Sequence, residues 1–595
     1  MPTAEPREKP LVIFDGRCGF CRIWIDYWKE LTGDRVEYAP SQEIGAQFPQ
    51  IPPEQFGKSV QLAMPDGENL SGSRAVFQLL TYAPGHGWWL KAYDAVPGFG
   101  PVTEASYRFI AGHRNLFYWV TVILFGRRIH PASYCLIEWL FVRALALIYL
   151  VAFVSFGVQA RGLIGSDGIS PMARYLTGAY GVLGGRAYRV LPTVFWLARS
   201  DAALLTVSIA GAVIAVVLLI GFFQRACLIC LFVLYLSIVS VGQDFLSFQW
   251  DLLLLETGFL AIFLGASTVV VWLFRLLLFR LMFSSGMVKI VSGDLSWRGL
   301  TAMSFHYFTQ PLPTPVAWYM QQLPFWFQKT STLFVFFIEL IIPFFVFLPR
   351  RARRFGAYWL IALQLLILIT GNYAFFNWLT LALTLFLFDD GRFRTWTPPG
   401  ARCFTPAPVA RAVAVILIVL GALQMGASLF GASYGTGLLQ LTAPFGIVNS
   451  YGLFAVMTTT RPEITVQGSN DGEHWSDYVF KYKPGPLARA PVWVAPYQPR
   501  LDWQMWFAAL SSFRDNAWFV NFLVRLLEGS PSVLRLLQTN PFPNGPPRYV
   551  RATTSLYRFT TFDERRATGN WWKAAPQGLY FPPISLNDVR QATLH

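Results

Sequence analysis

Long apolar runs after residue 130 are the feature that most limits what this chain can fold into. The chain has 595 residues, of which 54% are hydrophobic and only 14% are charged, and its mean hydropathy is +0.41. Soluble domains contain about 25% charged residues. Several of the runs are long enough to cross roughly 30 Å of hydrocarbon as helices. The sequence therefore predicts an integral membrane protein and excludes a single soluble domain.

The charged residues divide the chain into parts. Residues 1–130 contain 13 basic and 13 acidic residues, so the net charge of +15 arises after residue 130. There the basic residues lie beside apolar runs, where they orient helices and contact anionic lipid head groups. We therefore expect membrane lipids as partners, and no nucleic acid. We predict three domains: a soluble N-terminal domain (1–118), a polytopic membrane domain (119–440) and a β-rich C-terminal domain (441–595).

The N-terminal domain begins with a strand, a tight turn and a helix. Leu11–Phe14 is an apolar run that ends at Asp15-Gly16, and Cys18-Gly19-Phe20-Cys21 follows where a helical pattern begins. The remaining predicted elements are a strand over 35–38, a hairpin that starts at 59–63 and a helix over 73–82. These elements suffice for a small α/β sandwich.

The pair Cys18 and Cys21 predicts thiol-disulfide chemistry. A cysteine in the first turn of a helix lies next to unsatisfied backbone N–H groups, which favour the thiolate over the thiol. Cys18 is therefore the expected nucleophile, and Cys21, one turn later, is placed to resolve a mixed disulfide. The alternatives are two unreactive buried cysteines or half of a zinc site. Because His86 and His113 are isolated, we predict no metal site.

The residues from Asp15 to Cys21 resemble the D-x-x-C-x-x-C signature of the DCC family of thioredoxin-like thiol-disulfide oxidoreductases. The resemblance covers roughly residues 10–118 and includes Gly72–Ala75, Tyr107–Ala111 and Arg114. It implies a thioredoxin-like fold and a cytoplasmic thiol reductant as partner. For Asp15, the acid of the signature, three roles stay open: it orients the turn, accepts a proton near Cys21, or only caps the turn.

Basic residues beside the apolar runs predict the membrane topology. The N-terminus has no apolar segment typical of a signal peptide, so we expect it to be cytoplasmic. Arg127-Arg128 and the cluster 350–354 mark the inner side, Arg275 and Arg280 are interpreted as a further inner flank, and 291–328 is expected to be an outer loop. The expected spans are 135–158, 202–223, 226–241, 252–272, 332–348, 355–370, 375–388 and 409–430. The run 281–290 is too short to span unless its N-terminal flank contributes.

The C-terminal tail is expected to be extracytoplasmic and rich in β structure. A strand over 463–467, a turn at Asn470-Asp471-Gly472 and a strand over 478–480 predict a hairpin. Helical insertions are expected at 513–528 and 532–537.

From about residue 135 onward the chain resembles the lipase maturation factor family. The strings that carry this resemblance are long and unusual: Gly162–Pro171, Phe248–Asp251 with Leu255-Glu256, Phe283–Lys289, Ser304–Tyr307, Thr309–Pro313, Pro496–Phe507 and Trp571-Trp572. The resemblance implies a membrane-embedded helper for the folding of exported client proteins, lipases among them. The fused DCC-like domain and the lack of an endoplasmic retention signal favour the bacterial inner membrane. The family also resembles the HTTM proteins, which include vitamin K-dependent γ-carboxylase, but this similarity assigns no catalytic residue.

Ionisable residues at membrane depth are costly and are therefore candidates for function. Four qualify: Asp251, Glu256, Lys289 and Glu339. The alternative is that they snorkel to the membrane interface or pair between helices, for example Glu256 with Arg275 or Lys289.

A second pair, Cys227 and Cys230, lies near the inner end of its predicted span, as do Cys135 and Cys403. Because no acceptor pair lies on the far side, a complete disulfide relay across the bilayer is disfavoured. Two interpretations of the second pair stay open: thiol exchange with Cys18 and Cys21, or ordinary helix packing. No cofactor is certain, and a quinone is the candidate acceptor.

Three functions are compatible with these patterns. The leading one is a maturation factor coupled to thiol-disulfide exchange. The others are a non-redox membrane chaperone and an HTTM-like enzyme that acts on a quinone or a lipid.

Overall fold

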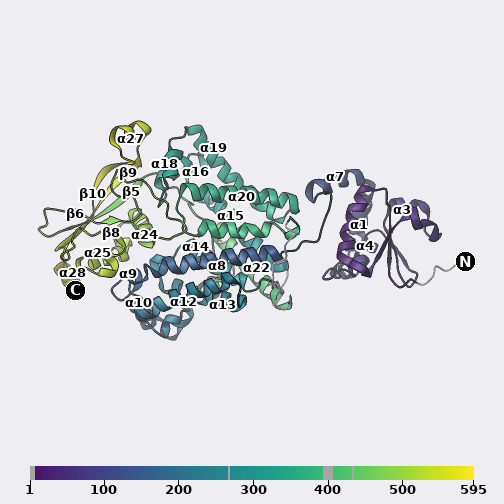
Figure 1. Cartoon of the computed structure of the whole chain (residues 1–595), viewed down its shortest axis with the longest axis horizontal. Coiled ribbons are helices and arrows are strands. Elements are labelled where there is room, and N and C mark those ends of the chain that lie inside the picture. The colour runs from purple at the N-terminus through teal and green to yellow at the C-terminus, as the bar shows by residue number, and fades with distance from the viewer. Residues whose placement is uncertain (1–6, 266–267, 393–406, 432–433, 595) are drawn as a thin grey trace. The chain divides into compact units, whose positions relative to one another are not determined.

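The computed structural model describes residues 7–265, 268–392, 407–431 and 434–594. These residues form two compact units (Figure 1). The first extends to Tyr134 and includes the short segments Phe347–Phe355 and 389–392, and the second comprises the rest.

A four-stranded sheet forms the centre of the N-terminal domain. Its strands are β1 (Leu11–Phe14), β2 (Glu37–Pro40), β3 (Gln61–Ala63) and β4 (Asn69–Ser71), in the order β2-β1-β3-β4. β1 is parallel to β2 and antiparallel to β3. Alternate side chains of a strand point to opposite faces of a sheet. Val12 and Phe14 accordingly pack into one hydrophobic cluster, and Leu11 and Ile13 into another.

Helices cover this sheet and extend the domain. They are α1 (Gly19–Thr32), α2 (Ser41–Ile44), α3 (Pro53–Lys58), α4 (Gly72–Leu80), α5 (Trp88–Ala95), α6 (Phe99–Gly112) and α7 (Arg114–Leu124). Ile25 of α1 and Leu79 of α4 belong to the same cluster as Val12. The strand, turn and helix expected around Cys18 are confirmed, as is the helix expected over 73–82.

Seven helices in the described residues are long and apolar enough to cross a membrane. They are α8 (Cys135–Gly157), α12 (Asp201–Ile220), α13 (Gln224–Val241), α15 (Thr268–Val291), α19 with its continuation (Phe325–Phe347), α20 (Arg350–Thr370) and α22 (Ala407–Phe430). Within the second unit α8 packs against α12, and α15 against α22. The prediction of a multi-pass membrane protein is confirmed.

Two of the expected spans are wrong. The run 252–272 is not one helix, because α14 (Gln249–Ala261) ends before a turn and α15 begins at Thr268. The run 375–388 forms a short helix, Phe376–Leu387, which is below the length of a span. α14 and this helix, which begins as α21 (Phe376–Thr384), contact each other and are largely buried by protein. Short helices are tolerated at membrane depth when protein covers them.

The interpretation of Arg275 and Arg280 as the inner flank of a span over 252–272 is wrong as well. Both lie inside α15, and 281–290 is the end of this long helix. Arg275 donates through Nε to the Phe386 carbonyl at 2.9 Å, and Arg280 donates to Glu256 at 2.6 Å. Because both side chains have hydrogen-bond acceptors inside the protein, they do not mark the end of a span.

Short helices make up the connections of the second unit. They are α9 (Ala160–Ile164), α10 (Met172–Leu183), α11 (Ala187–Val190), α16 (Leu295–Arg298), α17 (Met303–Thr309), α18 (Pro315–Gln321) and α23 (Thr436–Thr442). α16, α17 and α18 lie within the segment 291–328 that was expected to be a loop.

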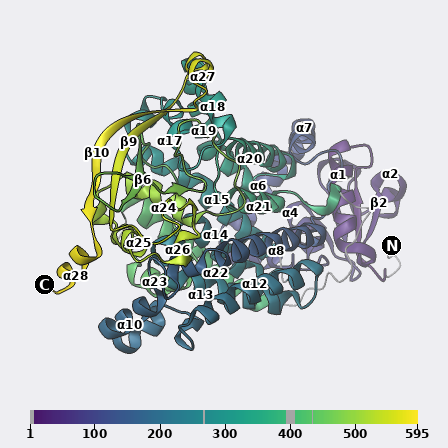
Figure 2. The ribbon, with the colours of Figure 1, turned by 60° about the vertical axis from the view of Figure 1, so that its left-hand side comes forward.

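A second sheet organises the C-terminal region, with the strand order β10-β9-β5-β6 (Figure 2). The two sheets there use β5 (Arg461–Ser469), β6 (Ser476–Asp477), β7 (Val479–Phe480), β8 (Leu537–Thr539), β9 (Tyr549–Phe559) and β10 (Trp572–Ile584). The hairpin is confirmed, but its second strand is β6, since β7 pairs with β8 in a separate sheet. The helices are α24 (Arg500–Ala509), α25 (Ala517–Leu527), α26 (Pro531–Leu534), α27 (Phe562–Thr568) and α28 (Leu586–Leu594).

Arg461, at the start of β5, joins this sheet to the segment after α17. Its side chain is fully buried and donates to the carbonyls of Phe308, Gln310 and Pro311. Its charge is matched by Glu463 at 2.7 Å. The guanidinium carries five N–H donors in a fixed planar fork, which lets it serve three backbone carbonyls and the Glu463 carboxylate together.

Replacing Arg461 with Met should therefore destabilise the second unit. Three buried carbonyls would lose a donor, at a cost of about 3 kcal/mol or more. The measurement is the midpoint of thermal unfolding of the full chain in detergent, and we expect a clear decrease. Arg566→Met is the matched control, because the Arg566 side chain is 82% exposed in its pair with Asp563. An equal midpoint for the two variants would show that Arg461 does not hold the segment.

Candidate functional site

The turn between β1 and α1 places Cys18 at the N-cap of the helix. Cys18 has an extended backbone, with φ −80° and ψ 113°, and its Sγ accepts a hydrogen bond from the Cys21 backbone N–H at 3.4 Å. The N–H of Cys18 in turn donates to the Asp15 carbonyl at 3.3 Å. Backbone N–H groups at this helix end have no partner within the helix, so a negatively charged sulfur is favoured there.

The Asp15 carboxylate holds the turn in shape. Its Oδ1 accepts from the Arg17 backbone N–H at 3.0 Å and from Gln42 Nε2 at 2.9 Å, and the Gln42 Oε1 accepts from the Gly16 N–H at 3.0 Å. Its Oδ2 lies 3.8 Å from Arg114 Nη1. Asp15 thus has an observed structural role that connects the turn to α2 and α7.

Two glycines let the turn approach its neighbours closely. A Cβ on Gly16 would lie 2.8 Å from the Pro40 Cβ, and a Cβ on Gly19 would lie 3.2 Å from the Tyr118 ring. Contacts near 3 Å force a neighbour to move. The glycines are therefore a steric requirement of this packing.

The two thiols have opposite acidities. The hydrogen bond from the Cys21 side chain lowers the pKa of Cys18 to about 6 from 9.0; burial opposes this effect, and the Cys21 backbone N–H and Arg114 add to it. The same interaction with Cys18 and burial raise the pKa of Cys21 well above its ordinary value. Both cysteines are free thiols and partly exposed. The arrangement provides one thiolate near neutral pH and one protonated donor beside it.

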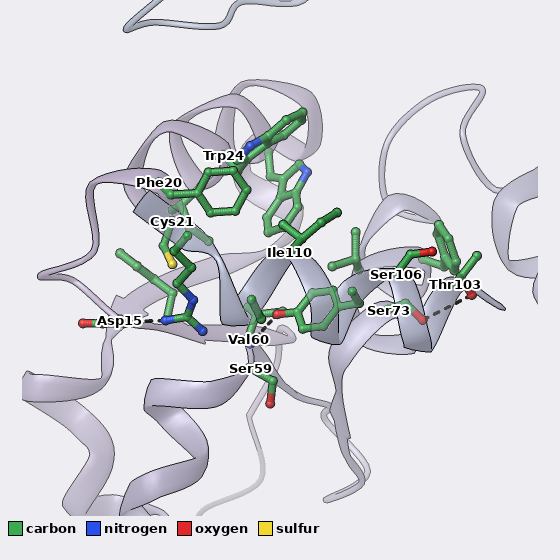
Figure 3. A pocket seen from close by; sticks show the side chains of 18 of the residues that line it. Asp15, Phe20, Cys21, Trp24, Ser59, Val60, Ser73, Thr103, Ser106 and Ile110 are labelled. Carbon is green, nitrogen blue, oxygen red and sulfur yellow. Dashed lines mark hydrogen bonds and ion pairs between the residues drawn. The ribbon is translucent and has the colours of Figure 1, made fainter. Parts of the chain in front are cut away.

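An apolar cavity of about 340 Å³ lies beside Cys21 (Figure 3). Its walls include Phe20 and Trp24 of α1 together with Tyr107 and Ile110 of α6. Sequence reasoning missed the role of Trp24, because a tryptophan at helical spacing is indistinguishable from an ordinary core residue. Arg114, quoted with the DCC signature, also lines this cavity.

Another residue that sequence reasoning missed is Glu104, which fixes the start of α4. Its Oε1 accepts from the Ser73 hydroxyl at 2.7 Å and from the Arg74 backbone N–H at 3.1 Å. Gly72 has φ +67°, and a Cβ there would lie 2.6 Å from Glu104 Oε2. Gly72 thus makes room for a carboxylate that lies 30 residues or more away in sequence.

The second cysteine pair lies on α13 and contains no disulfide. Cys227 is buried, and its Sγ lies 3.5 Å from the Phe222 carbonyl, whereas Cys230 is exposed. Cys135 is exposed at the start of α8, and Cys403 lies outside the described residues. Within the described ranges no group of three or more His, Cys, Asp or Glu side chains gathers as metal ligands do.

All four ionisable residues singled out in the apolar region are in ion pairs. The carboxylate of Asp251 binds Arg500 through two hydrogen bonds of 2.9 Å, and both side chains are fully buried. The Tyr235 hydroxyl donates to the same carboxylate at 2.5 Å. Two parallel N–H donors meeting one carboxylate form a strong, directional pair.

Glu256 pairs with Arg280 of α15 and with the segment before β5. Its Oε2 accepts from the Asn449 backbone N–H at 3.0 Å and from the Tyr451 hydroxyl at 2.8 Å. Of the pairing partners expected from the sequence, neither Arg275 nor Lys289 is the one observed, since Arg280 takes this place.

Lys289 and Glu339 form a third pair, with 2.7 Å between Nζ and Oε2. Glu339 lies in a π-helical turn, Phe337–Ile341, that interrupts the helix after α19. The pair lines a largely apolar cavity of about 420 Å³ between α15, α20 and the segment around α17. Such turns occur frequently at functional sites.

Three family models match the chain. Residues 136–395 match the lipase maturation factor transmembrane domain, 447–582 the lipase maturation factor C-terminal domain, and 12–120 the DCC1-like thiol-disulfide oxidoreductase. No solved structure shows significant similarity to the chain.

Similar proteins come from vertebrates. Lipase maturation factor 2 of Gallus gallus is 35% identical, with 76% of this chain and 81% of the relative covered. Lipase maturation factor 1 of Mus musculus and of Homo sapiens are each 36% identical, and each alignment covers 78% of this chain and 90% of the relative. The chain therefore belongs to the lipase maturation factor family and carries a DCC1-like thiol-disulfide oxidoreductase domain at its N-terminal end.

Proposed function

We propose that this protein is a membrane-bound maturation factor that assists the folding of exported client proteins, lipases among them, and that its N-terminal domain couples this role to thiol-disulfide exchange. The names of the relatives support the lipase clients. The single observation that supports the redox part is Cys18, an N-cap thiol whose pKa is lowered to about 6 beside a protonated Cys21.

The exchange proceeds in two displacements. The Cys18 thiolate attacks a disulfide of the substrate, the S–S bond breaks, and the departing thiolate takes up a proton. Formation of the mixed disulfide removes the Cys18 thiolate that raises the pKa of Cys21. Cys21 then loses its proton and attacks Cys18 Sγ, which releases the second substrate thiol and leaves a Cys18–Cys21 disulfide. A cytoplasmic thiol reductant reverses this oxidation.

The proposal includes a thioredoxin-like fold for the first domain and a fixed orientation. The strand order β2-β1-β3-β4 with α1 after β1 supports the fold. The N-terminus lies in the cytoplasm and the C-terminal region lies on the opposite side, as the basic flanks of the helices indicate. The bacterial inner membrane is the membrane that the sequence favours, and the vertebrate relatives give this part no support.

Two other functions remain candidates, and one observation supports each of them. A non-redox membrane chaperone is favoured by the ion pairs of Asp251, Glu256 and Lys289, which act as structural links. An HTTM-like enzyme acting on a lipid or quinone is favoured by the cavity beside Lys289 and Glu339.

Alkylation of Cys18 should be half-maximal near pH 6, because the thiolate is the reactive form and its pKa is lowered to about 6. The measurement is the rate of iodoacetamide reaction between pH 4 and pH 9 in a full chain whose other cysteines, apart from Cys21, are serine. Cys21→Ala removes the main hydrogen bond and should move the midpoint upward. A midpoint near 9 in the parent chain would rule out an activated thiol.

The variant Cys21→Ser should accumulate a mixed disulfide in cells, because the resolving thiol is absent. Mass spectrometry of the trapped species, separated without reductant, identifies the partner. Cys18→Ser should trap nothing. The substitutions Cys227→Ser and Cys230→Ser are then added to Cys21→Ser. If the second cysteine pair is the partner, the mixed disulfide on Cys18 disappears in this variant.

Co-expression with a dimeric lipase tests the maturation role directly. In cells that lack their own lipase maturation factors, we expect the chain to raise the lipase activity per amount of lipase protein. If redox exchange is part of the function, Cys18→Ala lowers this ratio at equal expression. Full retention by Cys18→Ala would favour the non-redox chaperone, and no effect of the parent chain would contradict the maturation role.

A further inference from the structure

We propose that the cavity beside Cys21 binds a membrane quinone, which accepts two electrons from the Cys18–Cys21 dithiol. This inference rests on the proposed thiol-disulfide function and names a second electron acceptor for the reduced cysteine pair, besides the substrate disulfide. The cavity has a volume of about 340 Å³, at the small end of the roughly 300–1,000 Å³ typical of ligand sites. That volume suits one substituted ring.

The wall chemistry fits a flat apolar ligand that carries hydrogen-bond acceptors. Phe20, Trp24, Trp28 and Phe77 contribute aromatic surface, on which a planar ring stacks. The Trp24 indole N–H is buried and has no acceptor among the described residues. A buried donor without a partner costs free energy, and a ligand carbonyl in the cavity removes that cost.

Arg114 supplies a cation to the same cavity. It lines the cavity together with Asp15, from which it lies 3.8 Å. A guanidinium stabilises the negative charge that develops on a carbonyl oxygen when a quinone is reduced. Cys21 lines the cavity and Cys18 does not. The ligand therefore meets the second thiol, while Cys18 stays available to a substrate disulfide.

The outer surface of the same helices explains how a lipid-soluble ligand reaches the cavity. Along α6, Thr103, Tyr107 and Ile110 face the cavity at helical spacing, whereas Val102 and Phe109 are 64% and 58% exposed. α7 continues the exposed apolar surface with Leu116, Trp119 and Ile123. Exposed apolar helix faces of this kind lie at bilayer interfaces.

The covalent connection is consistent with such a position. Only residues 125–134 separate the end of α7 from Cys135, where the first membrane-spanning helix begins. A fully extended segment of this length reaches at most about 35 Å. A short segment thus joins the first domain to a membrane-spanning helix.

The reaction balances without a further reagent. Two S–H bonds break at Cys18 and Cys21, one S–S bond forms between them, and the two carbonyl oxygens of the quinone become hydroxyls of the hydroquinone. The dithiol is oxidised by two electrons and the quinone is reduced by two.

The test uses the pre-reduced full chain in lipid nanodiscs without oxygen, with decylubiquinone as probe. The ring of this probe is fully substituted, so thiols do not add to a free ring position. We expect one quinone to be reduced for each Cys18–Cys21 disulfide formed. Ala111→Phe fills the cavity and should slow quinone reduction at least about tenfold, while thiol exchange with glutathione disulfide stays within about twofold. Ala105→Phe is the matched control, because Ala105 is exposed on the same helix and does not line the cavity.

A second variant avoids the risk that a filled cavity disturbs folding. Trp24→Phe keeps an aromatic wall but removes the N–H donor, and it should weaken quinone binding about fivefold with disulfide exchange unchanged. Binding is measured by quenching of tryptophan fluorescence in a Cys18→Ser/Cys21→Ser background, and Trp119→Phe corrects for the loss of one fluorophore.

The outcomes separate this inference from the proposed function. Normal exchange with glutathione disulfide but no oxidation by decylubiquinone would overturn the inference alone. Equal inhibition of quinone reduction and peptide disulfide exchange by Ala111→Phe would also overturn it, since the cavity would then hold a peptide side chain. Failure of Cys18 to exchange with any disulfide would overturn the proposed function itself.

Discussion

Charge in an apolar interior must be matched, and this constraint determines how the second unit is assembled. Removing a charged side chain from water costs several kcal/mol, which only a close partner offsets. Asp251 with Arg500, Glu256 with Arg280, and Lys289 with Glu339 each meet this condition at 2.6–2.9 Å. In the first of these pairs, a residue of a short interior helix binds a residue of the C-terminal region. The pairs therefore act as selective links, because only one partner position neutralises each charge.

In the first unit a negative charge is also stabilised by nearby donors, but this charge lies on a partly exposed thiol. There, one turn leaves a negative sulfur at a helix end and places its proton donor three residues later. The Asp15, Gln42 and Arg114 contacts keep this turn in place. In the second unit each buried charge is neutralised by a partner. In the first unit the N-cap of α1 instead favours the thiolate of Cys18. The buried charges of the second unit thus serve its assembly, whereas the charge at the N-cap of α1 is placed on a thiol.

Local features of the fold were predictable and distant partnerships were not. The strand Leu11–Phe14, the helix that follows and the thiol at its start depend on neighbouring residues, and all three were found from the sequence. Asp251 and Arg500 lie 249 residues apart, so no local pattern joins them. One of the two incorrect spans, 252–272, has a related cause: Arg275 and Arg280 have the composition of a cytoplasmic flank, but their partners Phe386 and Glu256 come from elsewhere in the fold. The tryptophan that lines the cavity beside Cys21 was missed because burial against a cavity and burial in a core use the same residue types.

The position of Arg500 has a consequence for biosynthesis. A ribosome delivers α13 and α14 long before it reaches the C-terminal region, so Asp251 enters the nascent protein without its guanidinium partner. Until residue 500 arrives, the carboxylate has to remain protonated, hydrated or covered by another protein. The membrane helices thus acquire their final arrangement only after translation is nearly complete. This member of the lipase maturation factor family is, by this feature, itself a late-maturing protein.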